Sequence, residues 1–204
     1  QAITPGMPIL FGCVSSVFDM RKMMLPYGAP EADLLGIATA QMARFYGIPS
    51  RGTGGSSDAN RLGMQAGFES LMSNLMCLLA GVTYVAHAAG ELENTLAVSV
   101  EKILIDDEII GMARRLGRGI DVSPDTLALD IIKHVAPRGH FLTHEHTIGH
   151  YRREQFIPAL ADRDKYEVWE AAGGKNMEER ARDRANQILA THEPAPLPEA
   201  AARE

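Results

Sequence analysis

Two consecutive glycines, Gly54 and Gly55, separate a short predicted strand at residues 48–53 from three small polar side chains. The polar residues are Ser56, Ser57 and Asp58. Glycine has no Cβ, so the backbone here can approach a ligand closely. A loop that follows a strand is also where α/β barrels place their reacting groups. The same composition is typical of an ordinary turn, which remains an alternative.

Polar residues also lie at the ends of the other predicted strands. His87 and Glu91 stand near the end of the run at residues 82–88, and His144 follows the run at 140–143. If these runs are parallel strands, their carboxyl ends meet on one face, and the polar residues surround one pocket. The residues expected at that pocket are Arg51, Ser56, Asp58, His87, Glu91, His144 and His146.

His144 and His146 are two residues apart, so a strand would direct both to the same side. With Glu145 they resemble part of a metal site. Structural zinc usually has four protein ligands and catalytic zinc three, so hydrogen-bonding loop residues are the favoured interpretation and no metal is assigned. Among the nearby carboxylates, Glu93 is expected to cap a helix that begins near residue 95, and the role of Glu91 stays open.

Alternating strands and helices are expected to position these residues. Hydrophobic spacing and Gly or Pro boundaries predict strands at residues 8–17, 48–53, 82–88 and 140–143. Helices are predicted at residues 30–46, 62–79, 96–116, 124–135, 148–160, 165–172 and 176–191. This α/β alternation indicates (βα) repeats that form half of a TIM barrel, with a small open sheet as the alternative. The acidic run at 106–108 is interpreted as a solvated helix face or as part of i,i+4 ion pairs.

The expected domains are half of a TIM-type barrel at residues 1–160, a helical extension at 161–192 and a disordered tail at 193–204. Half a barrel leaves two open sheet edges, which must be covered. We therefore expect a homo-oligomer or association with a missing amino-terminal half. The first residue is Gln, so we expect a processed product or a fragment of a longer protein.

Composition narrows the possible partners. The chain has 204 residues and a net charge of −6, which argues against binding nucleic acid because that needs a basic face. No apolar run approaches the ~20 residues needed to span a bilayer, so no membrane partner is expected. Cys13 and Cys77 lie in apolar runs without metal-like spacing. Free thiols of this kind indicate a reducing, cytoplasmic location.

Six segments together resemble the carboxyl-terminal part of the trimethylamine methyltransferase family. They are AQMARFYGIP at residues 40–49, GGSSD at 54–58, IDDE at 105–108, DTLAL at 125–129, FLTHEHT at 141–147 and WEAAG at 169–173. The resemblance covers nearly all of the chain except the tail. Each segment alone is weak, but their order and spacing are specific.

This resemblance implies a TIM barrel more than twice as long as this chain. It implies methyl transfer from a methylated amine to a corrinoid (cobalamin) carried by a separate partner protein, with no corrinoid held tightly by this chain. In the trimethylamine enzymes a pyrrolysine follows the paired glycines, and here Ser56 stands at that position. The departure favours the branch without pyrrolysine, in which glycine betaine is the precedent for the substrate.

A quaternary amine is already cationic, so its methyl group can be attacked without prior protonation. Carboxylates and aromatic faces would hold the cation, and an arginine or histidine would bind a betaine carboxylate. The residues expected to be catalytic are Ser56, Asp58, His87 and His144. Those expected to bind substrate are Arg51, Gly54, Gly55, Tyr84, Glu91 and His146. The alternatives are a non-catalytic half barrel that binds quaternary amines and an unrelated metal-dependent barrel enzyme.

Overall fold

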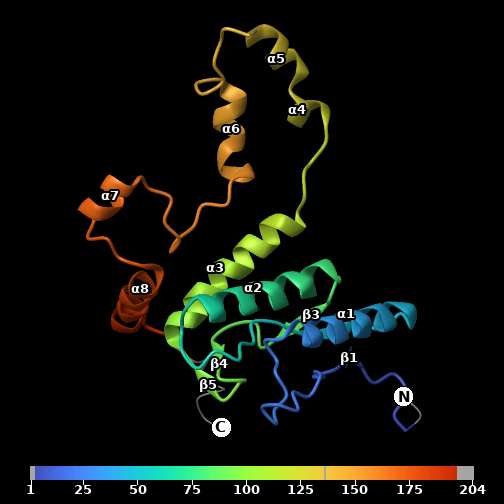
Figure 1. Ribbon diagram of the computed structural model, residues 1–204. Helices are drawn as coiled ribbons and strands as arrows, with labels where there is room; N and C mark the ends of the chain where they lie inside the picture. The colour runs from blue at the N-terminus through green and yellow to red at the C-terminus, as the bar shows by residue number, and fades with distance from the viewer. Residues whose placement is uncertain (1–2, 136, 197–204) are drawn as a thin grey trace.

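The computed structural model describes residues 3–135 and 137–196 and has a mixed α/β fold that is mostly helical (Figure 1). A three-stranded sheet contains β1 (Phe11–Gly12), β2 (Ser50–Thr53) and β3 (Tyr84–Ala86), paired in parallel in the order β1-β2-β3. The first three predicted strands are therefore confirmed, although β1 is much shorter than the predicted range 8–17.

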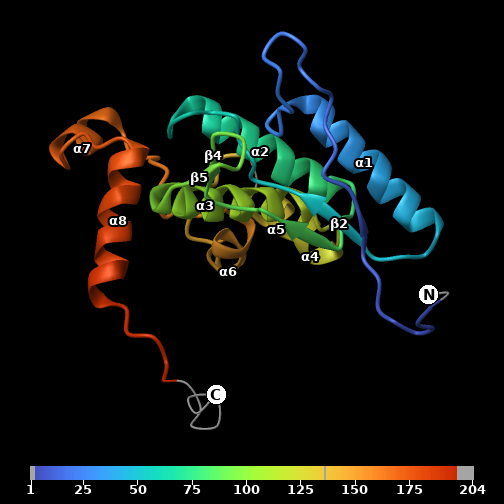
Figure 2. The same ribbon diagram turned by 90° about the horizontal axis from the view of Figure 1, so that it is seen from below.

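Long helices follow the strands in sequence. α1 (Pro30–Phe45) connects β1 to β2, α2 (Met64–Leu79) connects β2 to β3, and α3 (Val100–Gly117) comes after β3. Pro30 occupies the first turn of α1, where its missing N–H costs no hydrogen bond. Figure 2 shows α1, α2 and α3 in succession across the molecule, and α2 packs against both of the others.

A short hairpin, β4 (Glu91–Leu92) and β5 (Ala97–Val98), lies between β3 and α3. The helix predicted at residues 96–116 is confirmed as α3, but it begins at Val100, and the prediction that Glu93 caps it is wrong. Glu93 lies in the hairpin turn with a positive φ of 49°, and Ser99 caps α3 by accepting a hydrogen bond from the backbone N–H of Lys102. Leu92 is buried among small residues of the preceding loop and α2, which favours the hairpin.

The fourth predicted strand, at residues 140–143, is also wrong, because this segment is a turn that leads into a helix. Three helices form an arm that extends beyond α3 in Figure 1: α4 (Pro124–Leu127), α5 (Leu129–Val135) and α6 (Glu145–Glu154). The single helix predicted at 124–135 breaks at Ala128, whose φ of 50° is left-handed. His144 begins α6, since its Nδ1 accepts the backbone N–H of His146 at 3.1 Å.

The last helices are α7 (Tyr166–Ala171) and α8 (Met177–Thr191), and α8 packs on α3. The core between α3 and α8 contains Ile105, Ile109, Leu160 and Ala181. The carboxylate of Glu108 accepts three backbone N–H groups, from residues 159, 160 and 161, at 2.6–2.7 Å. The interpretation of residues 106–108 as a solvated face is therefore wrong for Asp106 and Glu108, which are both buried. Most of the predicted disordered tail, residues 197–204, lies outside the described residues.

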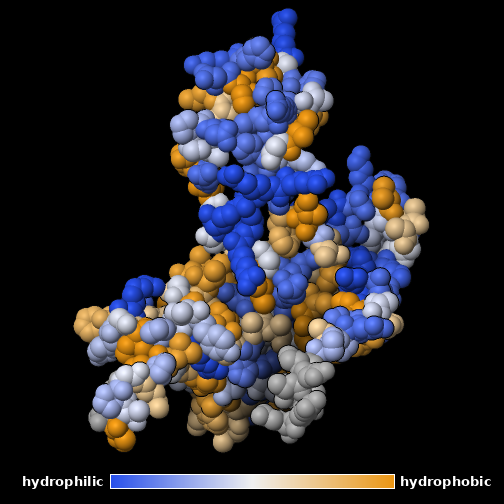
Figure 3. Space-filling view, turned by 180° about the vertical axis from the view of Figure 1, so that it is seen from behind, coloured by the Kyte–Doolittle hydropathy of each residue, from blue (hydrophilic) through white to orange (hydrophobic). Residues whose placement is uncertain are grey.

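The described strands form no closed barrel, and both outer edges of the sheet, on β1 and β3, lack a further strand within the described ranges. Many apolar side chains are exposed, among them Phe11, Val14 and Tyr84. Figure 3 shows hydrophobic residues gathered on the lower body, with a hydrophilic band at the base of the arm. Across the described ranges, no helix is both long and apolar enough to cross a membrane.

Candidate functional site

Three of the predicted site residues are in direct contact just beyond β2 and β3. Ser56 donates a hydrogen bond from Oγ to Oε2 of Glu91 at 3.3 Å, and Oε1 of Glu91 pairs with Nδ1 of His87. Ser56 is buried, whereas the side chains of Glu91 and His87 are 14% and 44% exposed. A carboxylate is thus held by two partners in a partly open position. We call this set of three residues the Ser56–Glu91–His87 cluster.

The paired glycines are required by close packing of the loop against its neighbours. Gly54 continues the sheet by donating its N–H to the carbonyl of Ala86, and a Cβ at Gly54 would lie only 2.5 Å from Oδ1 of Asn74. Gly55 has a φ of +68°, and a Cβ there would overlap the carbonyl group of Ala88. Packing alone therefore explains why both positions are glycine, and their role in substrate binding stays a prediction.

A buried ion pair on α3 holds both loops that carry the cluster. Lys102 and Asp106 are 1% and 0% exposed, and Nζ of Lys102 lies 2.6 Å from Oδ2 of Asp106. Lys102 also donates to the carbonyl of Gly55 at 2.9 Å, while Asp106 accepts the N–H of Gly90 at 2.7 Å and the hydroxyl of Ser70 at 2.6 Å. The residues just before Ser56 and Glu91 are thereby fixed to one helix.

Asp58 is bound to a different part of the chain. Its Oδ1 accepts the backbone N–H of Tyr27 at 3.0 Å, and its own N–H donates to Oε2 of Glu69 at 3.0 Å. Burial raises the pKa of the Asp58 carboxyl, and hydrogen bonds from the backbone of Gly28 and Tyr27 partly oppose this rise. The buried Glu69 also accepts the hydroxyl of Ser57 at 2.6 Å. Asp58 and Glu69 therefore fasten the loop at residues 27–28.

Arg51 and Tyr84 are paired neighbours on the parallel strands β2 and β3, so their side chains leave the same face of the sheet. Arg51 donates to the carbonyl of Cys13 at 3.3 Å, which ties the end of β1 to β2. Tyr84 is 56% exposed. This face thus presents a guanidinium and an accessible aromatic ring side by side.

His144 and His146 lie in the arm, at the start of α6, rather than beside the Ser56–Glu91–His87 cluster (Figure 1). Nε2 of His146 faces the carbonyl of Asp125 at 2.8 Å. The prediction that a strand would direct both histidines to one side is wrong, because they begin a helix. Among the described residues the contacts of His144 and His146 are with the arm itself.

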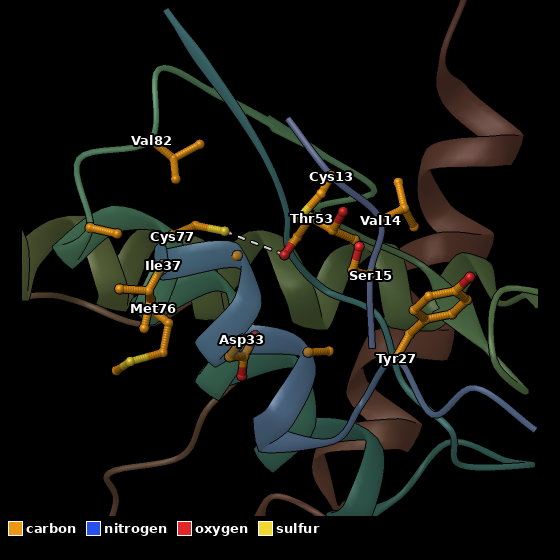
Figure 4. A pocket seen from close by; sticks show the side chains of 13 residues that line it. Cys13, Val14, Ser15, Tyr27, Asp33, Ile37, Thr53, Met76, Cys77 and Val82 are labelled. Carbon is orange, nitrogen blue, oxygen red and sulfur yellow. Dashed lines mark hydrogen bonds between the residues drawn. The ribbon is translucent and has the colours of Figure 1, made fainter. Parts of the chain in front are cut away.

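A small cavity of about 30 Å³ lies between the sheet and helices α1 and α2 (Figure 4). Two of the residues that line it each have a buried side-chain oxygen without a hydrogen-bond partner, Oδ2 of Asp33 and Oγ1 of Thr53. Burial raises the pKa of Asp33 to about 6 and, as the largest cause, that of the Cys77 thiol to about 11. The space and the polar atoms suit a single water molecule rather than an organic substrate.

Sequence reasoning missed Lys102 and Asp106, which hold the loops of the cluster, and Glu69, which binds Ser57 and Asp58 beside it. A signal for two of them is present, because Lys102 and Asp106 lie on the same helical stripe as Ile105, Ile109 and Ala113. That stripe is the buried face of α3. Charged residues are usually exposed, so their position on this stripe does not alone indicate burial.

The family model described as "Trimethylamine methyltransferase (MTTB)" matches residues 1–204. A glycine betaine methyltransferase of Desulfitobacterium hafniense (strain Y51) is 43% identical over 197 residues, which are 97% of this chain and 41% of that protein. The trimethylamine methyltransferase MttB of D. hafniense (strain DSM 10664 / DCB-2) is 35% identical over 199 residues, 98% of this chain and 40% of that protein. MttB of Methanosarcina barkeri is 35% identical over 202 residues, 97% of this chain and 39% of that protein. The chain thus spans about two fifths of these relatives, and it belongs to the trimethylamine methyltransferase family.

Proposed function

We propose that this chain is part of a methyltransferase that moves a methyl group from a quaternary amine, such as glycine betaine, to a corrinoid carried by a partner protein. Family membership and the 43% identity to a protein named glycine betaine methyltransferase support this substrate class. Ser56, rather than pyrrolysine, follows the paired glycines, which also favours a quaternary amine over trimethylamine.

The chain is proposed to supply about half of a TIM barrel. Three strands lie parallel in sequence order with a helix after each, which is the local topology of such a barrel. The free edges of β1 and β3 and the exposed apolar residues near them would be covered by further strands of a protein that is more than twice as long. Association with that remaining part, or with a second copy, would complete the pocket.

The observation that carries the proposal is the orientation of Glu91 by Ser56 and His87. A quaternary ammonium has no N–H to donate, so a protein holds it by negative charge and by aromatic faces. The two oxygens of Glu91 are fixed by partners on β2 and β3 loops, so the carboxylate can face a cation without losing side-chain entropy on binding.

Two neighbours suit the other parts of glycine betaine. The exposed ring of Tyr84 offers an aromatic face for the methylammonium group. The guanidinium of Arg51, on the paired position of β2, offers a charged partner for the carboxylate of the substrate. The corrinoid supplies a strongly nucleophilic cobalt as methyl acceptor, and the residues of this chain orient the N–CH3 bond and exclude water.

The decisive experiment measures corrinoid methylation by absorption spectroscopy, with the full-length protein, its corrinoid partner and a series of methylated amines. We expect transfer from a quaternary amine and no transfer from trimethylamine. Glu91→Gln should lower kcat/KM by about 10- to 100-fold, chiefly through KM, since a charged contact is worth about 1.5–3 kcal/mol.

Glu93→Gln is the matched control, because Glu93 lies in the same hairpin but is exposed and outside the cluster. It should leave the rate unchanged. Binding of a quaternary amine without methylation of the corrinoid would show a binding module instead of an enzyme. Equal rates for wild type and Glu91→Gln would remove Glu91 from the site.

A further inference from the structure

Three side chains of the arm converge on one point. Asp125 belongs to α4, and His146 and His150 lie one turn apart on α6 with their rings stacked, the centroids 4.1 Å apart. One ligand atom from each of the three lies within 4.8 Å of the others. The histidine side chains are 20% and 22% exposed and that of Asp125 is 68% exposed, so the point lies at the surface of the arm with only its imidazole side shielded. We call this set the arm cluster.

Hydrogen bonding fixes which nitrogen of His150 carries its proton. Nδ1 of His150 lies 2.8 Å from the backbone carbonyl of His146, and a carbonyl oxygen only accepts, so Nδ1 must donate. In the neutral ring Nε2 then bears a lone pair. That lone pair faces Oδ2 of Asp125 at 3.0 Å, and a carboxylate oxygen is an acceptor as well. Two acceptors at this distance require either a second proton on the ring or a metal ion between them.

We propose that the arm cluster binds a divalent metal ion of the zinc type, through Asp125 and through Nε2 of His146 and His150. Metal-binding histidines usually donate the other ring N–H to a carbonyl or carboxylate, as His150 does here. Zinc bonds of about 2.0–2.1 Å in a tetrahedron place neighbouring ligand atoms about 3.3 Å apart. The carboxylate oxygens lie 3.0 Å from Nε2 of His150 and 3.7 Å from Nε2 of His146.

The ligand set also selects among metals. Two imidazoles and one carboxylate suit zinc and similar transition metals, whereas magnesium and calcium prefer oxygen ligands alone. Three protein ligands leave one coordination position for water. In this structure Nε2 of His146 donates to the carbonyl of Asp125 at 2.8 Å, so on binding the ion this ring moves its proton to Nδ1 and gives up that hydrogen bond.

A bound metal ion would link α4 to α6 and so hold together the two ends of the segment between them. That segment contains the left-handed Ala128 and the turn at residues 141–143. The bound ion therefore orders the arm. Among the described residues, the arm cluster shares no hydrogen bond with Ser56 or Glu91, so the inference does not depend on the proposed methyl transfer.

The test titrates Zn²⁺ and Co²⁺ into the chelator-treated full-length protein and follows heat and visible absorption. We expect one ion per chain, and a Co²⁺ spectrum with the intense visible bands of four-coordinate cobalt. Mg²⁺ should not compete. Asp125→Asn and His150→Gln should each weaken Zn²⁺ binding by at least about 10-fold.

His134→Gln is the control, because His134 is an exposed histidine of α5 in the same arm and outside the cluster. It should bind Zn²⁺ as tightly as wild type. Absence of stoichiometric binding by wild type, or binding that survives both Asp125→Asn and His150→Gln, overturns the inference. The wild-type Co²⁺ spectrum gives an answer even if a variant folds poorly.

Discussion

Nζ of Lys102 donates a hydrogen bond at 2.9 Å to the carbonyl oxygen of Gly55, which lies 47 residues earlier in the chain. Through Asp106, the same helical turn also holds the N–H of Gly90. Ser56 and Glu91 each follow one of these two glycines. A single buried ion pair thus determines how the two loops meet, and Lys102 and Asp106 are positioning residues for the proposed site.

Removing one charge of this pair should lower the free energy of unfolding more than removing both charges. Lys102→Met leaves the buried Asp106 without its cation and should lower the free energy of unfolding by about 3–5 kcal/mol. The double variant Lys102→Met/Asp106→Leu should regain part of that loss, because no uncompensated charge remains. Chemical denaturation of all four combinations measures the coupling.

Asp107→Asn is the control, because Asp107 is exposed and adjacent to Asp106 in the sequence. It should be as stable as the wild type within about 0.5 kcal/mol. If the double variant is less stable than both single variants, the ion pair is not held as described. A positioning role also predicts that the double variant lowers kcat and raises KM for methyl transfer even where it is folded.

Gly55 cannot accept a side chain. Its φ of +68° disfavours a Cβ, and the Cβ would meet the Ala88 backbone, which cannot move aside easily. Gly55→Ala should therefore lower the free energy of unfolding by about 2 kcal/mol or more. Gly67→Ala is the matched substitution in open space within α2 and should raise it by about 0.5–1 kcal/mol. Thermal unfolding of the two variants should show shifts of opposite sign.

His87 adopts a left-handed conformation, with a φ of 55°. His87→Gly and His87→Ala both remove the imidazole that pairs with Glu91. Only the glycine relieves the backbone strain, so His87→Gly should be more stable than His87→Ala by about 0.5–1 kcal/mol. Urea denaturation of the two variants compares them directly. Equal stability, or a more stable alanine variant, would contradict the left-handed assignment.

Asp33 should make the stability fall as pH rises between about 4 and 6. Burial raises its folded pKa to about 6 from the ordinary 3.8, so the folded state keeps a proton that the unfolded state has already lost. The contribution is fully present below the unfolded pKa and disappears as pH passes the folded pKa. The difference corresponds to at most about 3 kcal/mol, and partial exposure reduces it to about 1–2 kcal/mol.

Asp33→Asn removes this titration. The free energy of unfolding of the variant relative to wild type should therefore increase by about 1–2 kcal/mol between pH 4 and pH 7.5. Denaturant titrations of both proteins at several pH values measure the difference, and effects from all other groups cancel. A difference that does not change with pH would mean that Asp33 titrates at its ordinary pKa.

Local patterns predicted the parts of the fold that depend on neighbouring residues. The apolar spacing before Gly47 predicted α1, and the helices predicted at residues 62–79 and 176–191 correspond to α2 and α8. The contact between Ser56 and Glu91 was expected, because parallel strands end at the same edge of a sheet. These inferences needed only periodicity, caps and strand direction.

The errors arose where distant contacts decide the structure. Residues 140–143 have the apolar composition of a strand, but among the described residues no strand pairs with the free edge of β3, and the His144 cap begins a helix there. Asp106 and Glu108 look solvated in the sequence, yet each meets partners that the chain supplies from far away. A single sequence does not display such partners.

Helix α3 carries two sets of fixed contacts within two turns, Lys102 and Asp106 toward the site loops and Glu108 toward residues 159–161. Successive residues of an α-helix are rotated by about 100° about the helix axis, so one added or deleted residue turns all later side chains by that angle. Inserting or deleting one residue between Asp106 and Glu108 would therefore turn one set away from its partners while the other stayed in place. This stretch should tolerate substitutions of its exposed residues but no change of length.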